Sequence, residues 1–191
     1  ADNAGGGAPG DGTTILAELL DQDARGAVIV LCATAAARAA KALGVGTIFA
    51  ASVGSKVDDL HGTAVPLVGD IIFQESVSYH RQGDYMTGQK IDLGEVAVIQ
   101  AGGVTVMLTE RKALPFDADH LAAAGIVAAA QQIIVVKSAI AWQAHFREFA
   151  KGEIYVDTPG VCASNLKRVD YTKLEQDIYP IADDGMWPAK G

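Results

Sequence analysis

The first fourteen residues are the segment that most constrains this chain. Five of them are glycines, two are aspartates and one is an asparagine, and an apolar helical pattern begins directly after them at Ile15. A glycine-rich loop that leads into a helix can present backbone N–H groups to a ligand. The loop lacks the Gly-Lys-Ser/Thr ending of a P-loop, and no strand precedes it as in a dinucleotide-binding fold. It is therefore either a ligand-binding loop or a flexible terminus before an ordinary helix cap at Asp11 or Thr13.

Composition limits the class of protein. The chain has 191 residues and half of them are hydrophobic, which is enough for one domain over residues 1–191 with a sizeable core. No apolar run reaches the roughly 18 residues of a membrane span, and no secretory signal is visible. The formal net charge of -8 makes nucleic acid and anionic membranes poor partners. Two distant cysteines do not make a disulfide scaffold, so we expect a reduced, cytoplasmic environment.

Hydrophobic periodicity predicts an α/β fold: a mixed sheet with flanking helices and a β-rich antiparallel middle section. The run Ala101-Gly102-Gly103 between two β-branched segments indicates a hairpin. From Cys162 onward we expect an irregular tail in which two X-Pro pairs, Tyr179-Pro180 and Trp187-Pro188, favour extended packing. The expected helices lie at 15–20, 33–43, within 117–132 and at 139–150, and the expected strands at 27–32, 47–53, 65–79, 95–100, 104–109, 133–137 and 153–157.

Three further polar motifs are candidate sites. Asp58 and His61 are spaced to act as an acid/base pair or as two metal ligands, although a polar turn between strands has the same composition. Lys137 follows a predicted strand, where α/β sheets place ligand sites, but it could equally be a surface lysine. Asp157 begins an Asp-Thr-Pro-Gly turn and is either a site carboxylate or an acceptor for turn N–H groups. No histidine base is identifiable for Cys162, which we therefore expect to pack in the interior.

The other histidines, His80, His120 and His145, are scattered along the chain. We expect His145 to be structural or at the surface. Three aromatic residues at helical spacing favour a core stripe over a binding stripe: Trp142, Phe146 and Phe149.

Taken in order, four motifs carry a resemblance. They are residues 2–13, residues 54–62, Val135-Val-Lys-Ser138 and Val156-Asp-Thr-Pro-Gly-Val-Cys162. Together they resemble the C-terminal domain of the MlrC (microcystinase C) family of metallopeptidases, from residue 2 to about residue 181. The resemblance implies that full-length members are zinc-dependent hydrolases that cleave peptide or amide bonds in linearised microcystin products.

The resemblance also implies how the protein is organised. The zinc ligands would belong to an N-terminal domain, and since this chain begins inside a motif without Met, we expect it to be a domain cut from a longer protein. We expect no metal in this chain, a zinc-binding N-terminal domain as its partner, a peptide or amide substrate and a homo-oligomer. The isolated domain would bind no catalytic zinc and be inactive.

Motif position suggests roles for individual residues. Asp2 and Asn3 would face the metal-side cleft in supporting catalytic roles, and the backbone of Gly5, Gly6 and Gly7 would lie against the substrate. The other expected substrate-binding residues are Asp58, His61, Lys137 and Asp157. This sequence departs from the usual family pattern at Ala4, where Pro is common, and at residues 141–143, where His-Phe-Arg is common. If that histidine and arginine contact the substrate in the family, the resemblance implies a substrate that differs from that of the type enzyme.

Two other classes of function stay open at this stage. The domain could serve folding or dimerisation without touching substrate, or it could be an independent anion- or nucleotide-binding module. The site hypothesis requires the opening loop, Asp58, His61, Lys137 and Asp157 to converge on one surface.

Overall fold

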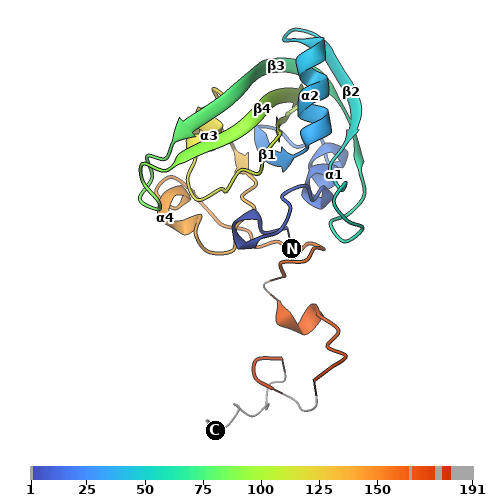
Figure 1. The fold of residues 1–191 in the computed structure, drawn as a ribbon, viewed down its shortest axis with the longest axis vertical. Coiled ribbons are helices and arrows are strands. Elements are labelled where there is room, and N and C mark those ends of the chain that lie inside the picture. The colour runs from blue at the N-terminus through green and yellow to red at the C-terminus, as the bar shows by residue number, and fades with distance from the viewer. Residues whose placement is uncertain (1, 164, 175–177, 182–191) are drawn as a thin grey trace.

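A computed structural model describes residues 2–163, 165–174 and 178–181, and Figure 1 shows the arrangement of its elements. A six-stranded sheet with strand order β2-β3-β4-β5-β1-β6 forms the centre. Strands β2 to β5 are antiparallel neighbours, whereas β1 runs parallel to both β5 and β6. The predicted mixed sheet with an antiparallel middle section is therefore confirmed. The strands are β1 Ala27–Cys32, β2 Ile48–Val53, β3 Val65–His80, β4 Lys90–Ala101, β5 Val104–Thr109 and β6 Ile133–Ile134.

The helices are short, and the two longest precede and follow β1. The α-helices are α1 Thr14–Asp21, α2 Thr34–Leu43, α3 Asp119–Ala122 and α4 Gln143–Phe146, and 3-10 helices span Ala4–Gly6, Ala128–Ala130 and Leu166–Arg168. The predicted helix-strand-helix start is confirmed, as is the end of α2 at Gly44, whose φ of 85° suits a residue without a Cβ. In Figure 1 the segment containing Leu166–Arg168 lies away from the sheet.

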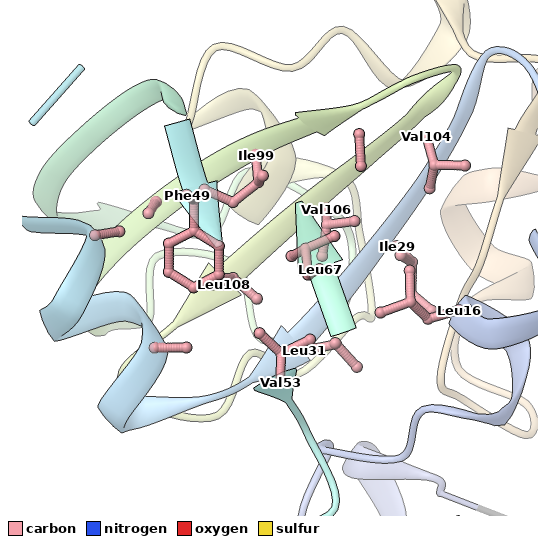
Figure 2. Packing of buried hydrophobic residues seen from close by; sticks show 14 of the residues in the cluster. Leu16, Ile29, Leu31, Phe49, Val53, Leu67, Ile99, Val104, Val106 and Leu108 are labelled. Atoms are coloured by element: carbon pink, nitrogen blue, oxygen red, sulfur yellow. The ribbon is translucent and has the colours of Figure 1, made fainter. Parts of the chain in front are cut away.

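Both faces of the sheet are buried because apolar residues occupy both sides of the central strands. Along β4, Ala97 and Ile99 belong to one core cluster, and Val96 and Val98 belong to another. Successive strand residues point to opposite faces, so this alternation places one cluster on each face. Figure 2 shows the first cluster, to which α1 and α2 contribute. The second cluster is closed by the chain around α3.

The β4–β5 hairpin is confirmed at the predicted glycines. Ala101 pairs with Val104, which leaves Gly102 and Gly103 as the two turn residues. Gly102 has a φ of 57°, which disfavours other residues. A Cβ on Gly103 would lie 2.3 Å from the Ala24 carbonyl oxygen, so this position has no room for a side chain.

The carboxyl ends of the parallel strands β5, β1 and β6 form the edge at which the site lies. Cys32 is the last residue of β1, and the segments that leave β5 and β6 carry Lys112 and Lys137. The opening loop crosses this edge: the Cys32 N–H donates to the Gly10 carbonyl at 3.0 Å and the Ala4 N–H donates to the Lys137 carbonyl at 3.1 Å. The glycine-rich loop is thus pinned to the sheet edge at which α/β proteins place ligands.

The last third departs from the sequence-based expectations. The helix expected within 117–132 is reduced to α3 and a 3-10 turn, because Gly125 adopts a φ of 74° between them. The strand expected at 133–137 ends at Ile134, since the chain beyond it turns to the opening loop. The helix expected at 139–150 is only α4, in which Phe146 is the buried member. Residues 153–157 form no strand because no partner strand lies beside them, and Ile154 is 90% exposed.

A buried ion pair fastens the loop after β3 to the segment before α3. Arg81 is fully buried, and its guanidinium donates to the Asp117 carboxylate at 2.6 Å and to the Leu114 carbonyl at 2.8 Å. The Asp119 carboxylate accepts the Gln82 N–H at 2.6 Å. These charge-assisted bonds hold together two segments that share no strand pairing.

In the part of the chain that the structure describes, no helix has the length and apolar character needed to cross a membrane. The longest described helix, α2, spans Thr34–Leu43 and has exposed Arg38 and Lys41 on its surface.

The two faces of β2 provide a test of the core. Phe49 is 1% exposed and belongs to the first core cluster, whereas its neighbour Ile48 is 66% exposed. Phe49→Ala should lower the free energy of unfolding by about 3–5 kcal/mol, because it removes buried area and leaves a cavity. Ile48→Ala, the control, should change it by about 0.5 kcal/mol or less. Equal losses in urea titrations of the two variants would show that this face of β2 is not the buried one.

Candidate site at the carboxyl edge of the sheet

The opening loop is folded around the carboxylate of Asp2. Its Oδ1 accepts the Gly10 N–H and its Oδ2 accepts the Gly12 N–H, both at 2.7 Å. A Cβ on Gly12 would lie 2.8 Å from Asp2 Oδ2, so the approach requires glycine there. Asp2 is buried and faces into the chain. Asn3 acts within the loop, where its Oδ1 accepts the Gly6 N–H at 3.1 Å.

Lys137, in the segment after β6, joins the same hydrogen-bond network around Asp2. Its Nζ donates to Asp2 Oδ2 at 2.7 Å, to the Gly10 carbonyl at 3.0 Å and to the Gly12 carbonyl at 2.8 Å. A lysine ammonium has three N–H donors, so all of them are used inside the chain. Lys137 therefore fixes the loop and keeps no donor for a ligand.

The ion pair sets the protonation of Asp2. Burial alone would raise the pKa of this carboxyl group. The positive charge of Lys137 and the hydrogen bonds from Lys137, Gly12 and Gly10 outweigh burial and lower the pKa below its ordinary value of 3.8. Asp2 is therefore an ionised structural carboxylate at neutral pH.

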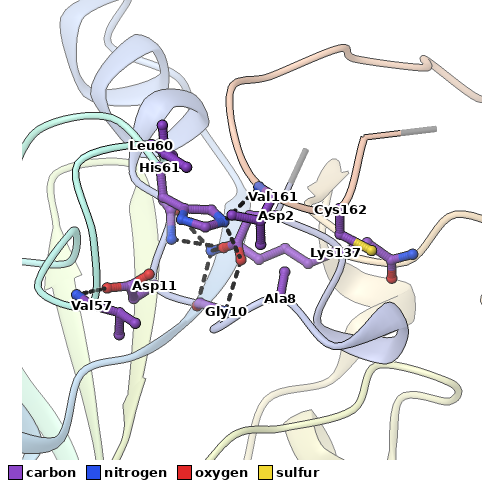
Figure 3. Close-up of polar contacts among 12 residues, drawn as sticks. Asp2, Ala8, Gly10, Asp11, Val57, Leu60, His61, Lys137, Val161 and Cys162 are labelled. Carbon is purple, nitrogen blue, oxygen red and sulfur yellow. Dashed lines mark hydrogen bonds and ion pairs between the residues drawn. The ribbon is translucent and has the colours of Figure 1, made fainter. Parts of the chain in front are cut away.

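His61 lies beside this pair and is held in one tautomer. Its Nδ1 is 2.7 Å from Asp58 Oδ1, and its Nε2 is 3.3 Å from the Val161 backbone nitrogen. Since a backbone N–H can only donate, Nε2 is the acceptor and the proton is on Nδ1, where it binds the Asp58 carboxylate. The Leu60 N–H and this His61 contact lower the pKa of the half-buried Asp58 carboxyl. Figure 3 shows His61, Asp2 and Lys137 side by side.

A second aspartate joins the opening loop to the turn after β2. Asp11 Oδ2 accepts the Lys56 N–H at 2.8 Å and the Val57 N–H at 3.1 Å. Thr13, which precedes α1, makes no side-chain cap bond; its hydroxyl instead contacts Ser55 Oγ at 3.0 Å. Of the two expected helix caps, Thr13 occupies the cap position, while both side chains serve tertiary contacts.

The three consecutive glycines, Gly5–Gly7, form an exposed ridge in the loop that the Asp2–Lys137 network holds. A Cβ on Gly6 would lie 2.6 Å from Cys162 Sγ and 2.7 Å from Asn3 Nδ2. Gly7 has a φ of 107°, a conformation that other residues rarely adopt. The ridge is therefore backbone presented to solvent in a fixed conformation, with no side chains of its own.

The structure brings together most of the residues that the sequence singled out. Asp2, Asn3, Gly5–Gly7, His61 and Lys137 belong to one connected cluster, and Asp58 joins it through His61. The fourth motif reaches the cluster through Val161 and Cys162, whose half-buried Sγ lies 3.4 Å from the Gly6 carbonyl oxygen. Asp157 is exposed on the chain leading to that turn.

Two members of the site were missed from the sequence. Asp11 was considered only as a helix cap, although the Asp-Gly pair inside a loop is a common signal for a turn-forming carboxylate. Lys112 was not singled out. Its Nζ donates to the Ala8 carbonyl at 2.9 Å and approaches the Gly7 carbonyl at 3.5 Å. Nothing in the spacing of residues around it marks such a contact.

The cluster does not fit a zinc ion. Both oxygens of Asp2 accept hydrogen bonds from Gly10, Gly12 and Lys137, and the lone pair of His61 Nε2 faces the Val161 N–H. Over residues 2–163, 165–174 and 178–181, no three His, Cys, Asp or Glu side chains are grouped so as to hold a metal. No step of a metal-dependent reaction is therefore assigned to ligands in this chain.

The fold and the cluster define a mixed α/β domain with a rigid glycine-rich loop at its carboxyl edge, and comparison with known proteins places it in a family. The chain belongs to the MlrC C-terminus family, whose model matches residues 1–173. Microcystinase C of Sphingomonas sp. is 28% identical over 158 residues, which cover 82% of this chain and 30% of that protein. A crystal structure of a protein proposed to be a metallopeptidase, from Mesorhizobium sp. BNC1, has a TM-score of 0.75 and 27% identity.

These relatives are much longer than the chain. The match covers 92% of this chain but 35% of the Mesorhizobium protein, and the chain spans about a third of the length of both relatives. It is therefore a domain of an MlrC-like protein, and the resemblance carried by the four motifs is confirmed.

The lowered pKa of Asp2 gives stability a defined pH dependence. Between the folded pKa and the ordinary value of 3.8, the unfolded chain binds more protons than the folded one. The contribution is fully present above about pH 5 and is lost as the pH falls through the folded pKa. Asp2→Asn should therefore lose less stability than the parent chain between about pH 5 and pH 3. Urea titrations across this range check it, with the exposed Asp21→Asn as control. Parallel curves for Asp2→Asn and parent would contradict it.

The ion pair itself is testable by a double-mutant cycle. Lys137→Met should cost about 3–5 kcal/mol, because it leaves the Asp2 carboxylate buried without its countercharge. The Asp2→Asn/Lys137→Met pair should cost less than the sum of the single changes, by about 1–3 kcal/mol. Lys41→Met, which breaks the surface pair with Glu95, should cost far less than Lys137→Met, because solvent screens that pair. Additive losses for Asp2 and Lys137 would show that the two charges act independently.

Proposed function

We propose that this domain positions the substrate in a zinc-dependent peptide or amide hydrolase of the MlrC type, with the zinc held by an N-terminal domain of the same protein. Microcystinase C and the Mesorhizobium protein, through their names, support a peptidase-type activity. The observation that carries the proposal is the exposed Gly5–Gly7 backbone, held in place by the buried Asp2–Lys137 pair.

A rigid loop of this kind serves positioning rather than proton transfer. Both oxygens of Asp2 and the side-chain oxygen of Asn3 bind within the loop, so their support of catalysis acts through the loop conformation. At Gly7 nothing lies within 4 Å of an added Cβ, so the missing side chain leaves open space there for a substrate backbone. Holding the scissile bond in a reactive geometry and excluding water are contributions that a domain without a metal can make. When bound in the full-length protein, zinc would supply an activated water and polarise the carbonyl.

The remaining candidates divide into supports and direct contacts. His61 is buried and the Lys137 side chain is 11% exposed, so both would act on the substrate through the loop that they hold. In this proposal the exposed carboxylate of Asp157 and the half-buried carboxylate of Asp58 contact an incoming peptide directly. Trp142 and Gln143 lie at α4, where Gln143 Nε2 is 3.3 Å from the Tyr155 hydroxyl. Because this segment differs from the usual family pattern, we propose a substrate other than microcystin.

One observation favours the structural alternative. The polar groups of Asp2, Asn3 and Lys137 have partners inside the chain. This hydrogen-bond network would be equally stable in a domain that only folds or dimerises. The same observation disfavours an anion site at Lys137, since its three donors are already in use.

The ridge is tested in the full-length protein with Gly6→Ala. The added methyl group meets Cys162 and Asn3 and displaces the ridge. A displacement of this kind should lower kcat/KM by about 10²-fold. Gly152→Ala is the matched control, because nothing lies within 4 Å of its added Cβ. Activity is measured on a library of linear peptides by mass spectrometry, alongside zinc content and melting temperature.

Each outcome has a defined meaning. Loss of activity in Gly6→Ala at unchanged zinc content supports positioning. Equal kcat/KM in Gly6→Ala and Gly152→Ala supports the structural alternative. Absence of peptide or amide hydrolysis by the zinc-loaded parent protein contradicts the hydrolase assignment. Stoichiometric zinc retained by residues 1–191 alone after dialysis would contradict the placement of the metal in another domain.

A further inference from the structure

Lys112, which lies at the carboxyl edge of the sheet, has no acidic partner among the described residues. Arg38, Lys41, Arg81, Arg111, Lys137 and Arg147 each form an ion pair with a carboxylate. Lys112 is half-buried, yet none of the ion pairs of the described residues includes it. Its Nζ contacts only the Ala8 and Gly7 carbonyl oxygens.

The position of this ammonium is set by the loop. The Ala8 carbonyl accepts one N–H at 2.9 Å, and the Gly7 carbonyl, at 3.5 Å, accepts a second weakly. A third donor and the full positive charge are therefore left for a ligand. Since Gly7 ends the exposed ridge, any chain lying along Gly5–Gly7 passes beside this charge. A half-buried cation retains more of its attraction for an anion than a fully solvated one.

The size of the cavity next to Lys112 indicates whether a ligand can reach its ammonium group from inside the cavity. Its lining includes Cys32, Lys112, Pro115, His120 and Lys137, and its volume of about 20 Å³ is room for about one water molecule. Its buried His120 has an Nδ1 without a hydrogen-bond partner. Burial, with the nearby charge of Arg81, lowers the pKa of His120 to about 4, so this ring adds no charge to the cavity at neutral pH. A carboxylate with its attached carbon does not fit inside and would approach Lys112 from its solvent-exposed side.

We infer that Lys112 is a specificity-determining residue that binds a carboxylate of the substrate. The inference rests on the proposed function and adds a substrate class to it: peptides with an anionic group beside the cleaved bond. A free C-terminal carboxylate and an acidic side chain present the same chemistry to the ammonium. Charge-assisted hydrogen bonds of this kind are the strong ones in recognition.

The test uses the full-length, zinc-loaded protein and matched peptides. A substrate is prepared as its free acid and as its C-terminal amide, and with Glu or Gln at each position. Lys112→Met should raise KM for the preferred anionic peptide by about 10- to 100-fold, with kcat nearly unchanged and the neutral peptide unaffected. Lys112→Arg should retain most of the preference. Arg25→Met removes the same charge just before β1, at the opposite end of that strand, and should change nothing.

Direct binding separates this inference from the proposed function. Peptide affinity is also measured by calorimetry with the metal chelated, so that no hydrolysis is needed. An acid-over-amide or Glu-over-Gln preference that Lys112→Met abolishes supports the inference, even where the parent protein hydrolyses no peptide. Equal affinity for anionic and neutral peptides overturns it, as does a preference that Lys112→Met leaves intact. Active hydrolysis together with either of these results would leave the hydrolase assignment standing without the carboxylate site.

Discussion

The buried ion pair between Asp2 and Lys137 is the interaction on which the site depends. It joins the start of the chain to the segment after β6, and the remaining bonds of both groups go to the backbone of Gly10 and Gly12. A buried charge that loses its partner is costly, so the two residues stabilise one arrangement of the loop strongly relative to others. Five glycines in fourteen residues would otherwise leave this segment with many accessible conformations.

The sequence predicted the first two thirds of the fold because local signals there agree with the tertiary contacts. The strand Ala27–Cys32 is a continuous apolar run and is buried on both faces, and Gly102-Gly103 turns where two β-branched segments meet. Residues 133–157 were predicted less well because apolar residues in this segment are not consistently buried, so their pattern does not indicate the secondary structure. Ile154 is almost fully exposed although it stands in a β-prone segment, because the sheet ends at β6 and offers it no partner. The predicted strand at Lys137 was shortened by a contact with residues more than a hundred positions away.

In the site, too, the sequence predicted which residues come together but not which partners they bind. Motif order was sufficient to bring Asp2, His61 and Lys137 into one set, but their chemistry suggested ligand-binding groups, whereas each is occupied inside the chain. The donors and acceptors of these side chains bind backbone groups inside the chain. The spacing of residues in the sequence does not predict such bonds. Lys112 shows the converse, because a lysine in a Glu-Arg-Lys run is ordinary in sequence and becomes distinctive only where it lacks a carboxylate. The roles proposed for Asp58 and Asp157 stay predictions.

Two lysines at the carboxyl edge of the sheet bind the same loop, and their contacts give them different roles. Lys137 uses its whole donor capacity to hold the loop, so its charge is neutralised internally by Asp2. Lys112 is fixed by two carbonyl oxygens of the same loop and retains its charge. A rigid loop with no outward charge would accept any backbone, and a charge on a mobile loop would select weakly, because ordering it on binding costs entropy. The internal pair makes the ridge rigid, and that rigidity is what allows one outward cation to discriminate between substrates.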